Sequence, residues 1–238
     1  MRDAEDPRPV PAAVALARLA VAGFVFTLLP GLLLVLARSL QWTHEGGTWD
    51  RAYGLGAFAA SGIALLWLSF VLPPGRPLLP VRPLAVLWRY VLFAVPWAAA
   101  LVGYLHLMHA LGHSVEPQEL LQYLASNGMG AHDSVVVVLA VVLGAPLAEE
   151  LLFRGWLQQA LEALLGARAA LLTSAALFGL VHGLDYALPL TAVGLFLGWL
   201  RNRYGSLSAP MLAHALHNGL TAACAVYWPE SLELMYPR

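Results

Sequence analysis

The chain has 238 residues, of which 60% are hydrophobic and 11% are charged, and its formal net charge is −1. Soluble globular domains contain about 45–50% apolar and about 25% charged residues, so the composition excludes a water-soluble fold and intrinsic disorder. Without a positive excess, no nucleic-acid partner is expected. The composition predicts an integral membrane protein in contact with the lipid bilayer.

The predicted fold is all-α: a polytopic membrane helix bundle of about seven transmembrane helices, with a polar catalytic cavity among the later ones. A helix needs about 20 apolar residues to cross the hydrocarbon core. The candidate spans are about Pro11–Leu36, Tyr53–Leu72, Leu84–Leu111, Ser134–Leu157, Arg168–Gly183, Leu188–Leu200 and Ser206–Trp228. Because only Leu184–Ala187 separates the fifth span from the sixth, one re-entrant hairpin is an alternative for that pair.

Three regions follow from these spans. Residues 1–133 form an N-terminal membrane region with an accessory or substrate-selecting role, residues 134–228 a catalytic membrane core, and residues 229–238 a short tail. The fourth span is expected to continue as a more polar helix to about Gly166, and Val115–Ala125 to form a short amphipathic helix at the interface.

Arginine placement predicts the orientation, because cytoplasmic loops are enriched in Lys and Arg. If the spans alternate, one face receives Arg2, Arg8, Arg76, Arg82, Arg168, Arg201 and Arg203. The other receives Arg38, Arg51 and Arg238, together with most loop acids. We therefore expect a multi-pass protein of the cell membrane with a cytoplasmic amino terminus.

Ionisable groups within membrane spans are costly and usually face a cavity or a partner. In this chain they concentrate on three of the later spans. They are Glu149, Glu150 and Arg154 on the fourth, His182 on the fifth, and His214, His217 and Asn218 on the seventh.

The spacing within these groups suggests distinct roles. Glu150 and Arg154 are four residues apart and are neighbours on a helix, so they can form an ion pair. Glu149 points about 100° away with no local cation, which makes it a candidate general base. His214 and Asn218 share one helix face, and they suit either a metal ligand with its orienting group or the donors of an oxyanion site. A helix-packing network and a buried core histidine are the alternatives.

Depth estimates place these residues at similar levels. Counted from the expected cytoplasmic ends, Glu149 and His182 lie about 21 Å deep, His214 about 12 Å and Asn218 about 18 Å. The three spans are therefore expected to converge on one site.

In sequence order, these residues resemble the three motifs of the CAAX-protease and bacteriocin-processing (CPBP, or Abi) intramembrane proteases. The matching strings are Glu149-Glu150-x-x-x-Arg154, Phe178-x-x-x-His182 and His214-x-x-x-Asn218. The resemblance covers roughly Val135–Thr221 and leaves the first three spans outside it.

The resemblance implies an endopeptidase acting on a membrane-associated peptide or protein. Glu149 is then expected to activate the attacking water, and His182 to help hold it. His214 and Asn218 are expected to stabilise the oxyanion, while Glu150 and Arg154 orient the site. His217 lies outside the motifs and is interpreted as a neighbouring or packing residue.

The use of a metal is left open. Glu149, His182 and His214 make up a two-histidine, one-carboxylate set that suits a divalent ion, above all zinc. A metal-free reaction, with Glu149 and His182 sharing the water, is equally compatible. The single cysteine, Cys224, excludes a Cys-rich zinc site and is expected to be packed among apolar residues.

Two other functions compete with proteolysis. One is a membrane scaffold or immunity protein of the same fold without turnover. The other is a transporter or haem-binding protein that uses His106, His109 and His113 near the outer end of the third span, where an interfacial histidine cluster is the simpler interpretation. Finally, Gly194-x-x-x-Gly198 predicts close helix packing within the chain.

Overall fold

The structure, a computed structural model, describes residues 10–43, 45, 50–126 and 139–237. The described part consists of helices and their connections and contains no strand. Outside the central segment, the helices are α1 Ala12–Ser39, α2 Asp50–Val71, α3 Pro83–Ala110, α4 Glu119–Ala125, α8 Ala167–Leu180, α9 Leu184–Tyr204, α10 Ser208–Tyr227 and α11 Glu230–Met235. The all-α prediction is confirmed.

The central segment is one helix with two π-helical sections. It runs through η1 (Ala140–Gly144), α6 (Ala145–Glu150), η2 (Leu151–Leu157) and α7 (Gln158–Leu165). Its last residue precedes Gly166, where the predicted polar extension was expected to end. The start of the predicted span, 134–138, lies outside the described residues.

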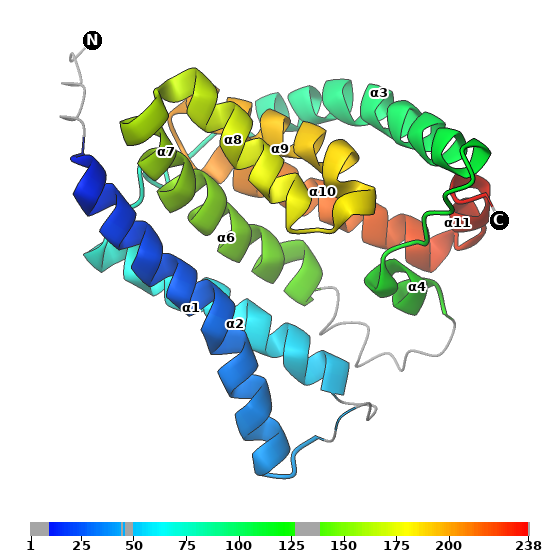
Figure 1. Cartoon of the computed structure of the whole chain (residues 1–238), viewed down its shortest axis with the longest axis horizontal. Helices are drawn as coiled ribbons and strands as arrows, with labels where there is room; N and C mark the ends of the chain where they lie inside the picture. Colours follow the sequence, from blue (N-terminus) through cyan, green and yellow to red (C-terminus); the bar gives the residue numbers. More distant parts are fainter. Residues whose placement is uncertain (1–9, 44, 46–49, 127–138, 238) are drawn as a thin grey trace.

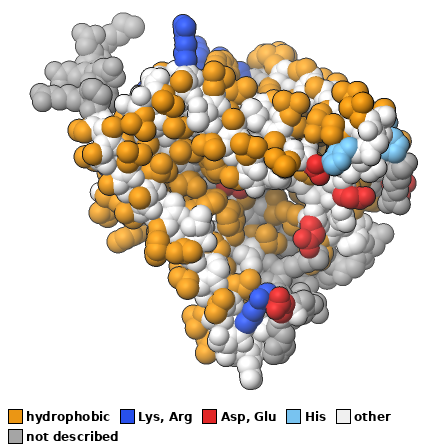
Figure 2. Space-filling view, viewed as in Figure 1, with side chains coloured by type: hydrophobic (Ala, Val, Ile, Leu, Met, Phe, Trp, Pro, Cys, Tyr) orange, Lys and Arg blue, Asp and Glu red, His pale blue; other side chains and the backbone are white. Residues whose placement is uncertain are grey.

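Among the described residues, three helices are long and apolar enough to cross a membrane: Ala12–Ser39, Tyr53–Val71 and Pro83–Ala110. Large hydrophobic side chains are exposed on them, such as Phe24, Trp67 and Trp88, and hydrophobic atoms cover much of the face in Figure 2. Such an apolar surface is stable in contact with lipid rather than water, so the chain is a membrane protein. The count of seven spans stays a prediction, since α8 is only 14 residues long.

The later helices form the centre of the molecule (Figure 1), with the α1–α2 pair on one side and α3 on the other. Trp156, Phe178, Leu197 and Leu207 are fully buried in the main core, which also includes Leu65 of α2. The first helices therefore share a core with the later ones. The predicted division at residue 133 stays a prediction.

The fifth and sixth predicted spans meet at a turn that differs from the predicted one. Helix α8 ends at Leu180, Val181–Gly183 form the turn, and α9 already begins at Leu184. Gly183 has a φ of +98°, a conformation that side chains with a Cβ rarely adopt. A Cβ on Gly179 would collide with the Ala187 carbonyl and Thr191, so this glycine allows the two helices to pack tightly.

The predicted close packing around Gly194 and Gly198 is also found between α8 and α9. A Cβ on Gly194 would lie 3.0 Å from Ala175, and one on Gly198 would collide with Leu171. Both partners belong to α8, so the predicted intrachain packing of this pair is confirmed. The expected amphipathic helix is shorter than predicted, since it spans only Glu119–Ala125.

Candidate active site

The predicted site residues come from three elements that meet in the core. Glu149 and Glu150 end α6, and Arg154 follows in η2. His214 and Asn218 lie on α10. His182 lies in the turn after α8 rather than within a span, because the helix ends two residues earlier.

Glu149 faces both site histidines. Its Oε2 atom lies 3.9 Å from His182 Nε2 and 3.9 Å from His214 Nε2. These distances exceed those of direct hydrogen bonds, and this buried oxygen has no hydrogen-bond partner among the described residues. The carboxylate and the two imidazoles therefore face one another but form no direct hydrogen bond.

Each histidine is oriented through its other ring nitrogen. His182 Nδ1 lies 2.7 Å from the Phe178 carbonyl oxygen, and His214 Nδ1 lies 2.8 Å from Glu150 Oε1. Both oxygens are acceptors, so the Nδ1–H groups donate to them. In the neutral rings, the two Nε2 atoms then present lone pairs toward Glu149.

Glu150 and Arg154 form the predicted ion pair. Arg154 Nε lies 3.3 Å from Glu150 Oε2, and both side chains are completely buried. The guanidinium also donates to the Gly194 carbonyl at 3.2 Å and lies 4.3 Å above the Phe178 ring. Glu150 thus joins the buried cation to His214, while Glu149 has no such partner.

Phe178 has a larger part in the site than its place in a motif implies. Its ring centroid lies 4.8 Å from that of His182 and 5.7 Å from that of His214. One aromatic ring therefore packs against the Arg154 guanidinium and both imidazoles. Apolar residues are common in this sequence, so the pattern gave no signal for this contact.

Asn218 and His217 lie beside this group with partners of their own. Asn218 Nδ2 donates to the Val141 carbonyl at 2.9 Å, which ties α10 to η1. His217 Nδ1 lies 3.4 Å from the Tyr90 hydroxyl, and its ring packs edge-on against Trp97. Neither aromatic partner was predicted, because the motifs do not reach into α3.

The donor set suits a metal in chemistry, and its spacing matches neither a closed zinc site nor a water-bridged pair. Two ligands of one tetrahedral zinc lie about 3.4 Å apart, and two groups hydrogen-bonded to one water about 4.6 Å apart. The observed separations of 3.9 Å fall between these values. Within the described ranges, no three His, Cys, Asp or Glu side chains are placed to hold a metal ion.

The second histidine group is dispersed. His113 pairs with Asp185 at 2.8 Å, and His106 Nε2 lies 3.4 Å from the Leu234 carbonyl. His109 Nδ1 is buried without a partner in the described part of the chain. These residues do not converge on one ligand position, and no observation favours the transporter or haem alternative.

Residues 131–220 match a family model described as type II CAAX prenyl endopeptidase Rce1-like. This part of the chain is therefore similar to Rce1-like endopeptidases. The matched range contains every predicted site residue, and the match is consistent with the CPBP resemblance. Proteins of the Rce1-like family are intramembrane proteases. No curated protein and no solved structure matches the chain significantly.

Proposed function

We propose that the protein is an intramembrane endopeptidase that hydrolyses a peptide bond of a membrane-associated protein or peptide. One observation carries the proposal: Glu149 Oε2 faces the Nε2 atoms of His182 and His214, at 3.9 Å from each. A base, a position for water and a donor for the developing oxyanion are what peptide hydrolysis requires. The Rce1-like match supports this reaction class.

In the proposed reaction, a water molecule lies between Glu149 and His182. Glu149 takes a proton from the water while the water oxygen attacks the carbonyl carbon of the substrate. The tetrahedral intermediate then breaks at the C–N bond, and Glu149 returns the proton to the leaving amine. His182 is held for this role by its bond to the Phe178 carbonyl.

His214 is the proposed oxyanion donor. Protonated at both nitrogens, His214 donates Nδ1–H to Glu150 and Nε2–H to the oxyanion. Asn218 is proposed as the second donor, which requires its amide to exchange the Val141 carbonyl for the substrate oxygen.

Glu149→Gln tests the proposal, because it preserves shape and removes the base. We expect cleavage to fall by at least about 100-fold, the contribution typical of a general base. New protein termini are measured in membranes of a deletion strain that carries either the wild type or the variant. Glu45→Gln, at an exposed position outside the site, is the matched control.

The comparison of the two strains also identifies the substrate. Termini that require Glu149 but not Glu45 define both the substrate and the cleaved bond. Identical terminus profiles for wild type and Glu149→Gln, at equal protein levels, would contradict proteolysis and favour the scaffold alternative.

Metal removal separates the two versions of the reaction. Because no three His, Cys, Asp or Glu side chains in the described part of the chain are placed to hold a metal ion, we expect the purified chain to keep its activity after treatment with a zinc chelator. Zinc content and cleavage are measured on the same sample. One zinc per chain, with activity lost on its removal and restored by added zinc, would show a metalloprotease that holds the ion through Glu149, His182 and His214.

A further inference from the structure

An apolar cavity of about 210 Å³ lies next to the proposed site, between α3, α9, α10 and α11. Tyr90, Trp97, Leu190 and Leu232 contribute to its wall. Its lining includes His217, which is one helical turn from His214 on α10. The cavity therefore lies on the α3 side of α10, one helical turn from His214.

Polar groups also line this cavity. Ser231 has an exposed fraction of only 7%, and its buried hydroxyl has no hydrogen-bond partner in the described part of the chain. His217, with an exposed fraction of 9%, lines the same space. A buried hydroxyl without a partner is costly. A ligand that offers hydrogen bonds as well as an apolar group fits this lining better than a plain hydrocarbon.

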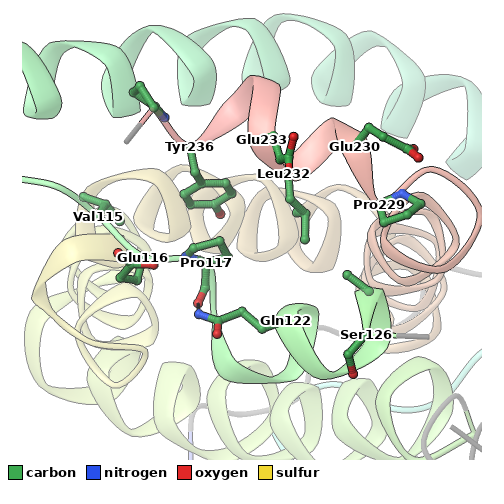
Figure 3. Close-up of a pocket in the computed structure, with 12 residues that line it drawn as sticks. Val115, Glu116, Pro117, Gln122, Ser126, Pro229, Glu230, Leu232, Glu233 and Tyr236 are labelled. Carbon is green, nitrogen blue, oxygen red and sulfur yellow. Dashed lines mark hydrogen bonds between the residues drawn. The ribbon is translucent and has the colours of Figure 1, made fainter. Parts of the chain in front are cut away.

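A second cavity, of about 430 Å³, adjoins the first. Leu232 and Tyr236 line both cavities and so form their common wall. The larger cavity is bounded by α4, α11 and the segment before α4, and Figure 3 shows Glu116, Glu230 and Glu233 around it. Its lining contains no Lys, Arg or His within the described residues, so its carboxylates attract a cation.

We propose that the two cavities together recognise the substrate as an extended peptide in which a large apolar side chain enters the smaller cavity and a nearby Lys or Arg side chain lies among the three glutamates. This inference rests on the proposed function and specifies its substrate class. A cavity of about 150 Å³ is large enough for benzene, so about 210 Å³ accepts one large side chain. The Ser231 hydroxyl is then available to a backbone group of the peptide.

Binding is measured with the full chain carrying Glu149→Gln, reconstituted in liposomes, so that no peptide is cut. The probes are short synthetic peptides with Phe and Arg, with Phe and Gln, and with Ala and Arg at the same positions. Cys224 is the only cysteine and lines the apolar cavity, so protection from a maleimide reports occupancy. Fluorescence anisotropy gives the affinity.

We expect the peptide with Phe and Arg to bind most tightly and to protect Cys224. Replacing Glu230 and Glu233 together by Gln is expected to weaken its binding three- to tenfold and to leave the Phe and Gln peptide unchanged, because exposed ion pairs are individually weak. Glu45→Gln is the matched charge control. Ala94→Phe, which fills the apolar cavity, is expected to weaken both Phe peptides and to slow Cys224 labelling.

The outcomes separate this inference from the proposed function. Equal binding of all peptides, no binding, or an Arg preference that survives the double Gln substitution would overturn the inference. Cleavage by the wild type without any preference for Phe and Arg would overturn it while the proteolytic function stands. The expected binding pattern without wild-type cleavage of the bound peptide would support the site and count against proteolysis.

Discussion

Arg154 is the most consequential single residue outside the reacting groups. Its side chain is fully buried with that of Glu150, and Glu150 in turn accepts a hydrogen bond from His214. Loss of one member of a buried ion pair leaves the other charge without compensation, which is more costly than loss of both. The pair therefore controls both stability and the orientation of an imidazole.

Arg154→Met is expected to lower the free energy of unfolding by about 3–5 kcal/mol, because Glu150 becomes an unpaired buried carboxylate. The double variant Arg154→Met with Glu150→Leu is expected to recover part of that loss and to remain inactive. Thermal unfolding in detergent and peptide cleavage are measured for both variants. A double variant less stable than Arg154→Met would contradict this account.

At the level of helices, sequence spacing located most of the elements but not their junctions. The seven predicted stretches correspond to helices or to the described part of one, since apolar runs and Pro-Gly breakers mark them clearly. The turn at Val181–Gly183 was missed because Leu184–Ala187 suits a helix as well as a loop. What ends α8 there is the positive φ of Gly183.

The same limitation applies to the π-helical sections. Motif spacing assumes 3.6 residues per turn, yet η1 and η2 flank the two glutamates. Close approaches between helices accompany these sections: a Cβ on Gly144 would lie 2.8 Å from Ala59, and one on Gly155 would lie 2.9 Å from Pro74. Such tertiary contacts between distant residues leave no local pattern. Short π-helical sections within α-helices are frequent at functional sites.

Within the site, charge pairing was predictable and aromatic packing was not. The i, i+4 spacing of Glu150 and Arg154 directly predicts their contact. The convergence of His182 and His214 on Glu149 followed from similar depths along three elements. By contrast, the contacts of Phe178, Tyr90 and Trp97 with the imidazoles depend on the relative rotation of the helices, which apolar composition does not encode.

For the molecule as a whole, charge is distributed between two ends of the bundle. At one end, the Leu207 N–H donates to the Pro77 carbonyl at 3.0 Å, so the α2–α3 connection, with Arg76 and Arg82, lies against the α9–α10 connection. At the other end, the Tyr186 hydroxyl donates to the Glu116 carbonyl at 2.5 Å and lies 3.2 Å from the Tyr236 hydroxyl. The first end is rich in arginine and the second in carboxylates, as the predicted orientation requires.

This distribution predicts that the arginine-rich end lies in the cytoplasm, because positive residues favour that side of the membrane. In a Cys224→Ala background, a cysteine in place of Glu233 is expected to react with a membrane-impermeant maleimide in intact cells. A cysteine in place of Arg168 is expected to react only after the membrane is opened. Both positions are exposed, and neither is part of the proposed reaction. The reverse labelling pattern would place the acidic cavity in the cytoplasm, and the peptide would then enter from that side.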